Sequence, residues 1–192
     1  MADGDTELAA RIATGDPLAL EALYRRYVER VWRYAWFRTH SRDAAAEIVQ
    51  ETFLRVARSA GQFQGRSAFA TWLFALTRSA AIDLARRARQ SGGSDRPAEV
   101  LRLVRPDDDP PDPLGEEETR RAVRRAVADL PGPQRDAIVL CELSGLSIRQ
   151  AAEVLGWGQS RVKVTLCRAR RRLRELLKRY VTGERAQRSG RV

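Results

Sequence analysis

The sequence predicts an all-α protein made of two small helical domains joined by a flexible linker. Apolar residues recur at steps of three and four in both halves of the chain, as on one face of an α-helix. No segment of four to eight residues alternates convincingly between apolar and polar residues, so we expect no β-sheet. From about Ala88 to Glu118 the chain becomes rich in proline, glycine and acidic residues, which is typical of a linker.

Three amphipathic helices are predicted in the N-terminal half, after a lead-in of residues 1–15. Asp16 supplies an N-cap and Pro17 a first-turn proline for the first helix. A second helix begins after Ser41 and a third after Ser67. The residues expected on their buried faces include Leu23, Tyr27, Val31, Ile48, Phe53, Val56, Leu73 and Leu76.

The C-terminal half is predicted to contain a helix-turn-helix between about Leu130 and Lys178. A helix that ends at the sequence PGP is followed by the short apolar helix RDAIVLCEL. In the next segment, SIRQAAEVLG, Ser147 and Gln150 have the spacing of a capping box. The glycines of the sequence GWG then turn the chain into the final helix. The apolar face of that helix consists of Val162, Leu166, Ala169, Leu173, Leu176 and Tyr180.

The charge of the chain predicts a polyanionic partner, and its distribution favours DNA. The formal net charge is +10, and no acidic residue lies between Arg161 and Arg174 on the final helix. A membrane surface is disfavoured because the apolar face is narrow and has no aromatic residue before Tyr180. We expect the helix to enter the major groove, with its first residues near base edges and later arginines near phosphates. The residues assigned to these contacts are Arg161, Lys163, Val164, Thr165, Arg168 and Arg171.

The segment GQFQGRSAFATWLFALTRS, which joins the second and third helices, places aromatic residues among glutamines and arginines. Aromatic rings stack on unpaired bases, while amides and guanidinium groups hold base edges and backbone, so this composition suits single-stranded DNA. The alternative is that the aromatic residues form core. For Phe69 and Trp72 packing is the favoured role.

The sequence lacks the residue patterns of an enzyme, a metal site or a membrane protein. There is one histidine, His40, which we expect at a helix end on the surface, and no His/Cys cluster has metal-site spacing. Cys141 and Cys167 lack the pattern of a disulfide scaffold, so buried or partly buried thiols are favoured over a redox switch. No apolar run is long enough to span a bilayer and the N-terminus carries acids, so we expect a cytoplasmic protein without cofactor or metal.

Two sets of motifs, in order along the chain, resemble a known family. RDAAAEIVQETFLRVAR and the following pattern F-x-G-x-S-x-F-x-T-W-L-x-x-L-x-R are similar to region 2 of bacterial sigma factors. DLPGPQRDAIVL, ELSGLS and V-K-x-x-L-x-R-A-R-x-x-L are similar to region 4. With no domain between them, the chain resembles the extracytoplasmic-function (ECF, group IV) sigma factors of RNA polymerase. This implies a region 2 domain at 16–88, a linker at 89–117, a region 4 domain at 118–180 and a basic tail at 181–192.

The resemblance implies a subunit that binds core RNA polymerase and directs promoter-specific initiation. Region 2 would contact the clamp coiled coil of the largest subunit and would read and melt the −10 element. Region 4 would bind the −35 element as duplex and contact the flap of the second-largest subunit. The residues implied for polymerase binding are Glu47, Gln50 and Glu51. Those implied for the −10 element are Gln62, Phe63, Arg66, Phe69, Trp72, Arg78, Ser79 and Arg86.

The resemblance also implies regulation and a role for the linker. Many members of the family are held inactive by an anti-sigma factor, and this chain has no sensor or ligand domain of its own. The acidic residues from Asp107 to Glu118 fit the family's habit of threading this segment through the polymerase's nucleic-acid channel, with passive tethering as the alternative.

The chain departs from the family pattern at positions that matter for promoter choice. Ser79 stands where asparagine is frequent, and Gln150 stands where glutamate is common. Arg161, Val164 and Thr165 differ from the usual residues of the reading helix, so no promoter sequence can be transferred. The alternative function is a stand-alone dimeric helix-turn-helix regulator, which would bind DNA tightly without core polymerase.

Overall fold

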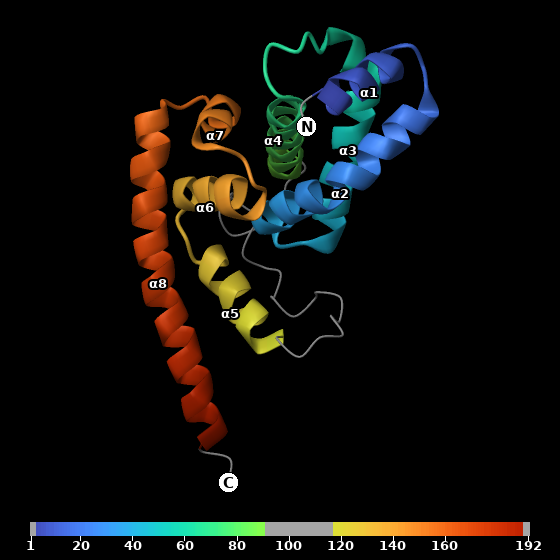
Figure 1. Cartoon of the computed structure of the whole chain (residues 1–192). Helices are drawn as coiled ribbons and strands as arrows, with labels where there is room; N and C mark the ends of the chain where they lie inside the picture. Colours follow the sequence, from blue (N-terminus) through green and yellow to red (C-terminus); the bar gives the residue numbers. More distant parts are fainter. Residues whose placement is uncertain (1–2, 91–116, 190–192) are drawn as a thin grey trace.

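The computed structural model describes residues 3–90 and 117–189, and every element within these ranges is a helix (Figure 1). The predicted all-α fold class is confirmed. Most of the predicted linker, with its acidic run, lies outside the described residues, as do the end of the basic tail and the side chains of Arg179 and Tyr180.

The N-terminal half consists of α1 (Asp3–Ala13), α2 (Pro17–Thr39), α3 (Arg42–Ser59), a short 3-10 helix (Ala60–Gln62) and α4 (Phe69–Gln90). The Asp16 carboxylate caps α2 by accepting a hydrogen bond from the backbone N–H of Leu18 at 2.9 Å. No helix was predicted within residues 1–15, yet α1 buries Ala9 and Ile12 against the core of this half. Two buried apolar side chains on so short a helix give a weak periodic signal.

The C-terminal half consists of α5 (Glu117–Ala128), α6 (Gly132–Ile138), a π-helical turn (Val139–Leu143), α7 (Ile148–Leu155) and α8 (Gln159–Ser189). The predicted capping box is confirmed. The Gln150 N–H donates to the Ser147 hydroxyl at 3.2 Å, and the Ser147 N–H donates to the Gln150 side chain at 2.8 Å. After α7, Gly156 adopts a left-handed conformation (φ 67°) and ends the helix, which sets the turn into α8.

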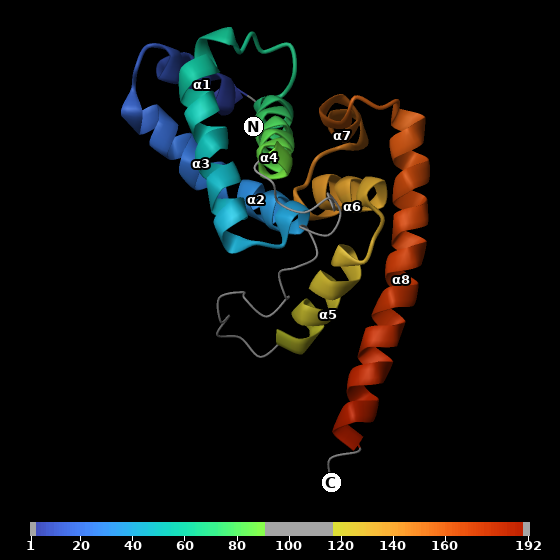
Figure 2. The ribbon, with the colours of Figure 1, turned by 180° about the vertical axis from the view of Figure 1, so that it is seen from behind.

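The two halves pack against each other around a continuous hydrophobic cluster. In Figures 1 and 2, α4 lies beside α7 and the end of α2 lies beside α6. Phe74 and Ala81 of α4 belong to the same cluster as Ile138, Ala151 and Leu155 of the other half. The sequence patterns predicted two domains but not this contact between them.

Arginines of α2 reinforce the junction by binding groups of the C-terminal half. The Arg30 side chain donates to the Ser144 carbonyl at 2.8 Å, and Arg33 donates to the Leu143 carbonyl at 2.8 Å. Both carbonyls lie at the C-terminal end of the π-helical turn, where cationic side chains are favourable. Arg38 forms a partly buried ion pair with Asp136 at 2.8 Å.

His40 was predicted to lie on the surface at a helix end, and the structure confirms only the helix end. It is the helix-end residue of α2 in a left-handed conformation (φ 51°), but its ring is partly buried at the junction, 3.3 Å from the Arg135 guanidinium. Burial, and then the neighbouring Arg135 charge, lower the pKa of His40 to about 4. The neutral ring is therefore the form that fits the junction.

The two cysteines differ in environment. Cys141 is half-buried against the shared cluster, and burial raises the pKa of its thiol to about 11. Cys167 is exposed, so the prediction of a buried or partly buried thiol is wrong for this residue. It follows Leu166 on α8 and so turns toward the solvent face, away from the apolar stripe.

Candidate nucleic-acid interface

The exposed face of α8 is basic and carries the residues predicted to bind the −35 element. Arg161, Val164, Arg168 and Arg171 are exposed and lie at steps of three and four, so they share one face. The opposite face, formed by Val162, Leu166 and Ala169, is buried in the shared cluster. The helix is thus anchored by one stripe and presents the other to solvent.

Lys163 and Thr165 lie to the sides of this face. At about 100° per residue, Lys163 is turned roughly 200° from Arg161, and it is exposed. Thr165 is half-buried at the edge of the apolar stripe. The six predicted residues therefore form one central row of four with two flanking residues.

Packing of α5, α6 and α7 holds α8 in place (Figure 1). On the side that faces the π-helical turn, Arg170 forms an ion pair with Glu142. The helical repeat places this arginine off the DNA-facing row, and its ion pair holds it there.

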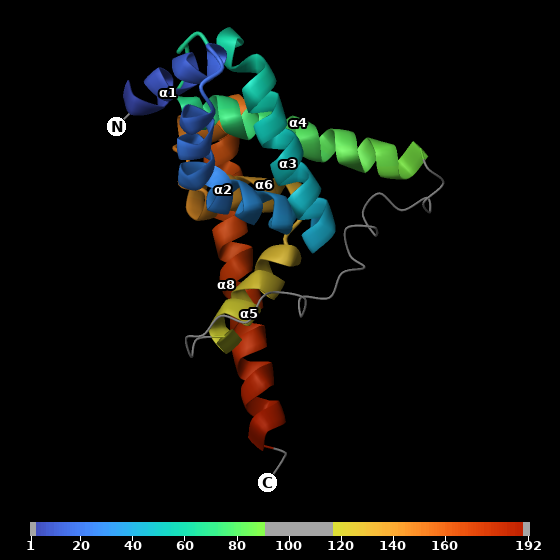
Figure 3. The same cartoon turned by 90° about the vertical axis from the view of Figure 1, so that its right-hand side faces the viewer.

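A second exposed row runs along α4, which extends away from the rest of the N-terminal half in Figure 3. Trp72, Ser79 and Arg86 recur at steps of seven residues, so they share a face. Ile82, which the sequence analysis did not single out, lies on the same face and is 40% exposed. The structure thus brings together three of the residues predicted to read the −10 element.

The remaining predicted −10 residues lie in the segment before α4 or beside the exposed row. Gln62 and Arg66 are exposed between α3 and α4. Arg78 is half-buried, and its charge acts on the Tyr34 phenol. It precedes Ile82 by four residues and therefore borders the exposed row.

The aromatic residues of the loop form a cluster at the start of α4. The Phe63 ring lies 5.3 Å from the Trp72 ring and 5.5 Å from the Phe69 ring, between centroids. Phe69 is only 3% exposed and also contacts Tyr27, so its ring is enclosed and cannot stack on a base. Phe69 is a core residue that supports Trp72 and Phe63, which are half-buried and keep accessible surface.

Arg55 of α3 makes two hydrogen bonds to α4 and one within α3. Its guanidinium binds Glu51 at 2.7 Å, the Ser79 hydroxyl at 3.0 Å and Asp83 at 3.0 Å. These carboxylates raise the pKa of Arg55, against the opposing effect of burial. Two predicted contact residues, Glu51 and Ser79, are thus already hydrogen-bonded within the protein. Spacing along one helix does not show which residues of another helix meet Arg55, so this link could not be predicted from the sequence.

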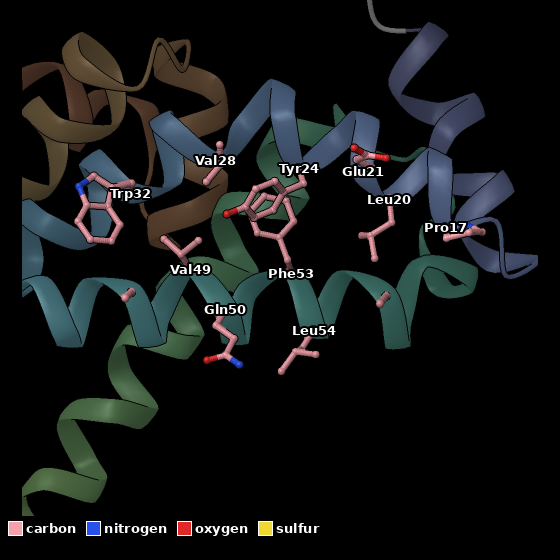
Figure 4. A pocket seen from close by; sticks show the side chains of 12 residues that line it. Pro17, Leu20, Glu21, Tyr24, Val28, Trp32, Val49, Gln50, Phe53 and Leu54 are labelled. Carbon is pink, nitrogen blue, oxygen red and sulfur yellow. The ribbon is translucent and has the colours of Figure 1, made fainter.

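Glu47 and Gln50 lie on the same side of α3 as Glu51 and are exposed. Glu47 forms an ion pair with Arg87 of α4 at 2.9 Å. Gln50 instead lies at the rim of a groove between α2 and α3, together with Leu54 (Figure 4).

That groove has a volume of about 560 Å³ and a predominantly apolar lining. Figure 4 shows Tyr24 and Phe53 meeting across it, where their rings lie 4.7 Å apart between centroids. Two of its lining residues, Tyr24 and Leu54, are 43% and 41% exposed. Large apolar side chains gathered at one surface mark an interaction site.

Residues 3–90 and 117–189 contain no helix long and apolar enough to cross a membrane. Over the same residues, no group of three or more His, Cys, Asp or Glu side chains is arranged to hold a metal ion.

Comparisons with known proteins agree with the two halves of the fold. Residues 23–91 match the family model for sigma-70 region 2, and residues 120–173 match that for sigma-70 region 4. The ECF RNA polymerase sigma factor SigM of Mycobacterium tuberculosis is 34% identical over 179 residues, which cover 93% of this chain and 87% of SigM.

Solved structures match the chain across both halves. The sigma factor RpoE of Bartonella quintana, determined in complex with the anti-sigma factor NepR, has a TM-score of 0.67 and 26% identity, covering 82% of this chain and 98% of that one. CnrH, determined with the cytosolic domain of CnrY, shares the fold with a TM-score of 0.69 and 24% identity, covering 91% of this chain and 97% of its own. With region 2 in its N-terminal half, region 4 in its C-terminal half and relatives that match nearly its whole length, the chain belongs to the ECF sigma factors of RNA polymerase.

Proposed function

We propose that this sigma factor directs initiation through three surfaces: the α2–α3 groove docks on core RNA polymerase, the exposed row of α4 acts on the −10 element, and α8 binds the −35 element. The observation that carries the proposal is that each surface is exposed on its own helix face while the opposite face of that helix is core. The row on α8 supplies a largely basic surface, and the start of α4 supplies an accessible tryptophan.

The groove suits a helical partner, and we assign it to the clamp coiled coil of the largest polymerase subunit. Helices bind apolar grooves by burying one apolar stripe, and the rim then supplies polar contacts. Leu54 and Tyr24 offer apolar surface, while Gln50 lies beside them. Because Glu51 is held by Arg55 and Glu47 by Arg87, we place the direct contacts on Gln50 and Leu54.

On α4, Trp72 is the group best placed to stack on an unpaired base. Its ring is braced by Phe63 and Phe69, and Ser79 and Arg86 continue the same row along the helix. Stacking on an aromatic ring stabilises an extruded base by about 1–3 kcal/mol, which helps to offset the cost of unpairing. Gln62 and Arg66 lie in the loop that precedes this row.

The packed halves must separate if both DNA surfaces act on one promoter. The −10 and −35 elements are numbered by their position upstream of the start site, so they lie about 25 base pairs apart. This is roughly 85 Å at 3.4 Å per base pair. The longest helix of the packed protein, α8, has 31 residues and is only about 46 Å long at 1.5 Å per residue. The predicted linker, at roughly 3.3 Å per residue, is long enough to permit the separation.

An anti-sigma factor is the proposed regulator, and the cytoplasm the proposed location. Bartonella RpoE was solved with an anti-sigma factor, and this chain resembles it across both halves. The packed arrangement is the form that we assign to such a complex. A stand-alone dimeric regulator is not favoured, because the relatives are sigma factors along nearly their whole length, and nothing in these relatives points to an enzyme.

The docking surface is tested with two exposed apolar residues of matched exposure. Leu54→Glu should weaken binding to purified core polymerase at least tenfold, whereas Ile82→Glu should leave that binding unchanged, since Ile82 lies on the DNA-facing row of α4. Leu54 is 41% and Ile82 40% exposed, so both substitutions should be equally tolerated by the fold. Equal affinity of the Leu54 variant and the unmodified protein would show that the groove is not the docking site.

A further inference from the structure

The turn between α7 and α8 holds an aromatic ring against the first DNA-facing arginine. The Cζ atom of Arg161 lies 4.3 Å from the centroid of the Trp157 ring. This distance is well within the range of a cation–π contact, for which tryptophan is the most favourable partner.

Trp157 is itself held in place. The backbone N–H of this residue, directly after the left-handed Gly156, donates to the Ala152 carbonyl of α7 at 2.9 Å. The ring is half-buried and packs against the shared hydrophobic cluster. It therefore provides a fixed platform at the point where α8 begins.

Stacking on this platform restricts the guanidinium of Arg161 without using its hydrogen bonds. The ring contacts the face of the guanidinium plane, whereas all five N–H donors lie in that plane and point outward. A free arginine on a helix samples many rotamers, so a stacked one is prepared to bind two acceptors at once.

The position of Arg161 indicates which part of DNA it meets. It lies in the first turn of the second helix of the helix-turn-helix, where side chains reach base edges. An arginine there binds guanine through O6 and N7, the commonest specific contact in the major groove. Val164, one turn along the same face and 50% exposed, is the apolar member of an otherwise basic row and matches the methyl group of thymine.

We propose that Trp157 is a positioning residue that orients Arg161 to read a guanine in the −35 element, with Val164 contacting the methyl group of a nearby thymine. The proposal rests on the function assigned above to α8 and specifies the sequence that this helix prefers. It also explains how a chain that departs from its family at Arg161 and Val164 acquires its own promoter preference.

The experiment measures base preference in the −35 region with the complete sigma factor bound to core polymerase and a DNA library randomised there. Arg161→Ala should lower the preference for guanine at one position about fivefold or more. Trp157→Leu, which keeps an apolar side chain but removes the π face, should lower the same preference about two- to fivefold. Trp157→Phe should retain most of it, and the double variant should be no worse than Arg161→Ala alone.

A purely structural role for Trp157 predicts a different pattern. In that case Trp157→Leu would lower the melting temperature or weaken binding equally for all sequences, and the preference at the Arg161 position would persist. Either that pattern or a guanine preference that survives Arg161→Ala overturns the proposal. Val164→Ser provides the matched test of the methyl contact: an unchanged thymine preference would refute it.

Failure of this inference can be told apart from failure of the proposed function. If unmodified holoenzyme selects promoters but Trp157→Leu leaves every base preference unchanged, only the positioning role is wrong. If unmodified holoenzyme selects no sequence in the −35 region, the assignment of α8 to that element and the role of Trp157 both fail.

Discussion

The neutral His40 at the junction of the two halves predicts that the protein loses stability in mild acid. The Nε2 atom of its ring faces the Arg135 guanidinium at 3.3 Å, so the neutral ring can accept a hydrogen bond from that group. A protonated ring could not accept this bond and would place a second positive charge beside Arg135. Asp129 acts in the opposite direction but only partly offsets the effects of burial and Arg135 on the pKa of His40.

The magnitude follows from the pKa of His40, which falls from 6.5 to about 4 on folding. Above pH 6.5 the ring is neutral in both states, and the folded protein has its full stability. Between pH 6.5 and 4 the unfolded chain binds the proton more tightly than the folded protein does. The free energy of unfolding therefore decreases as the pH is lowered through this range. From pH 7.5 to pH 5 the loss amounts to about 2 kcal/mol.

The assay is urea unfolding at pH 7.5 and pH 5 of the unmodified protein and of His40→Asn. Asparagine is the matched replacement because it tolerates the left-handed backbone at this position (φ 51°) and does not titrate. The unmodified protein should lose about 2 kcal/mol more than the variant on acidification, since carboxylates titrate alike in both. Equal losses in the two proteins would refute the role assigned to His40.

Three further predictions concern single side chains. Arg38→Ala should lower the free energy of unfolding by about 1–3 kcal/mol, because it leaves a largely buried carboxylate of α6 without its cation, whereas Arg25→Ala, from an exposed ion pair, should change it by less than about 0.5 kcal/mol. Similar values from urea titrations would contradict this. Ser147→Ala should cost about 1 kcal/mol in the same assay, and no loss would mean that the capping box contributes nothing. Cys167 should react with a thiol reagent at least about tenfold faster than Cys141, as followed by mass spectrometry, and equal rates would be inconsistent with the structure.

Local features of the helices could be predicted from the sequence because they depend on neighbouring residues. The capping box at Ser147 and Gln150 needs only a spacing of three residues, and the buried stripe of α8 needs only the helical repeat. The row formed by Arg161 and Arg168 follows directly from that stripe, because the opposite face of an anchored helix is exposed.

Contacts between helices could not be predicted in this way, because periodicity shows which face is apolar but not what covers it. The four consecutive residues from Tyr34 to Phe37 are all buried, which requires partners on every side of α2. That run was the available signal for the junction with the C-terminal half. Arg55 and Trp157 gave no such signal, since their partners come from another helix or from the geometry of a turn.

The most direct test of the account is run-off transcription from purified components, followed by mapping of the start sites. Core polymerase with this sigma factor should initiate at discrete sites that require both a −10 and a −35 sequence, and scrambling either sequence should abolish the product. Without core polymerase the chain should bind the same DNA poorly. The assignment of the protein as an initiation subunit with two DNA-binding regions would be contradicted if no promoter-dependent product formed. Tight, specific DNA binding by the chain alone would contradict it as well.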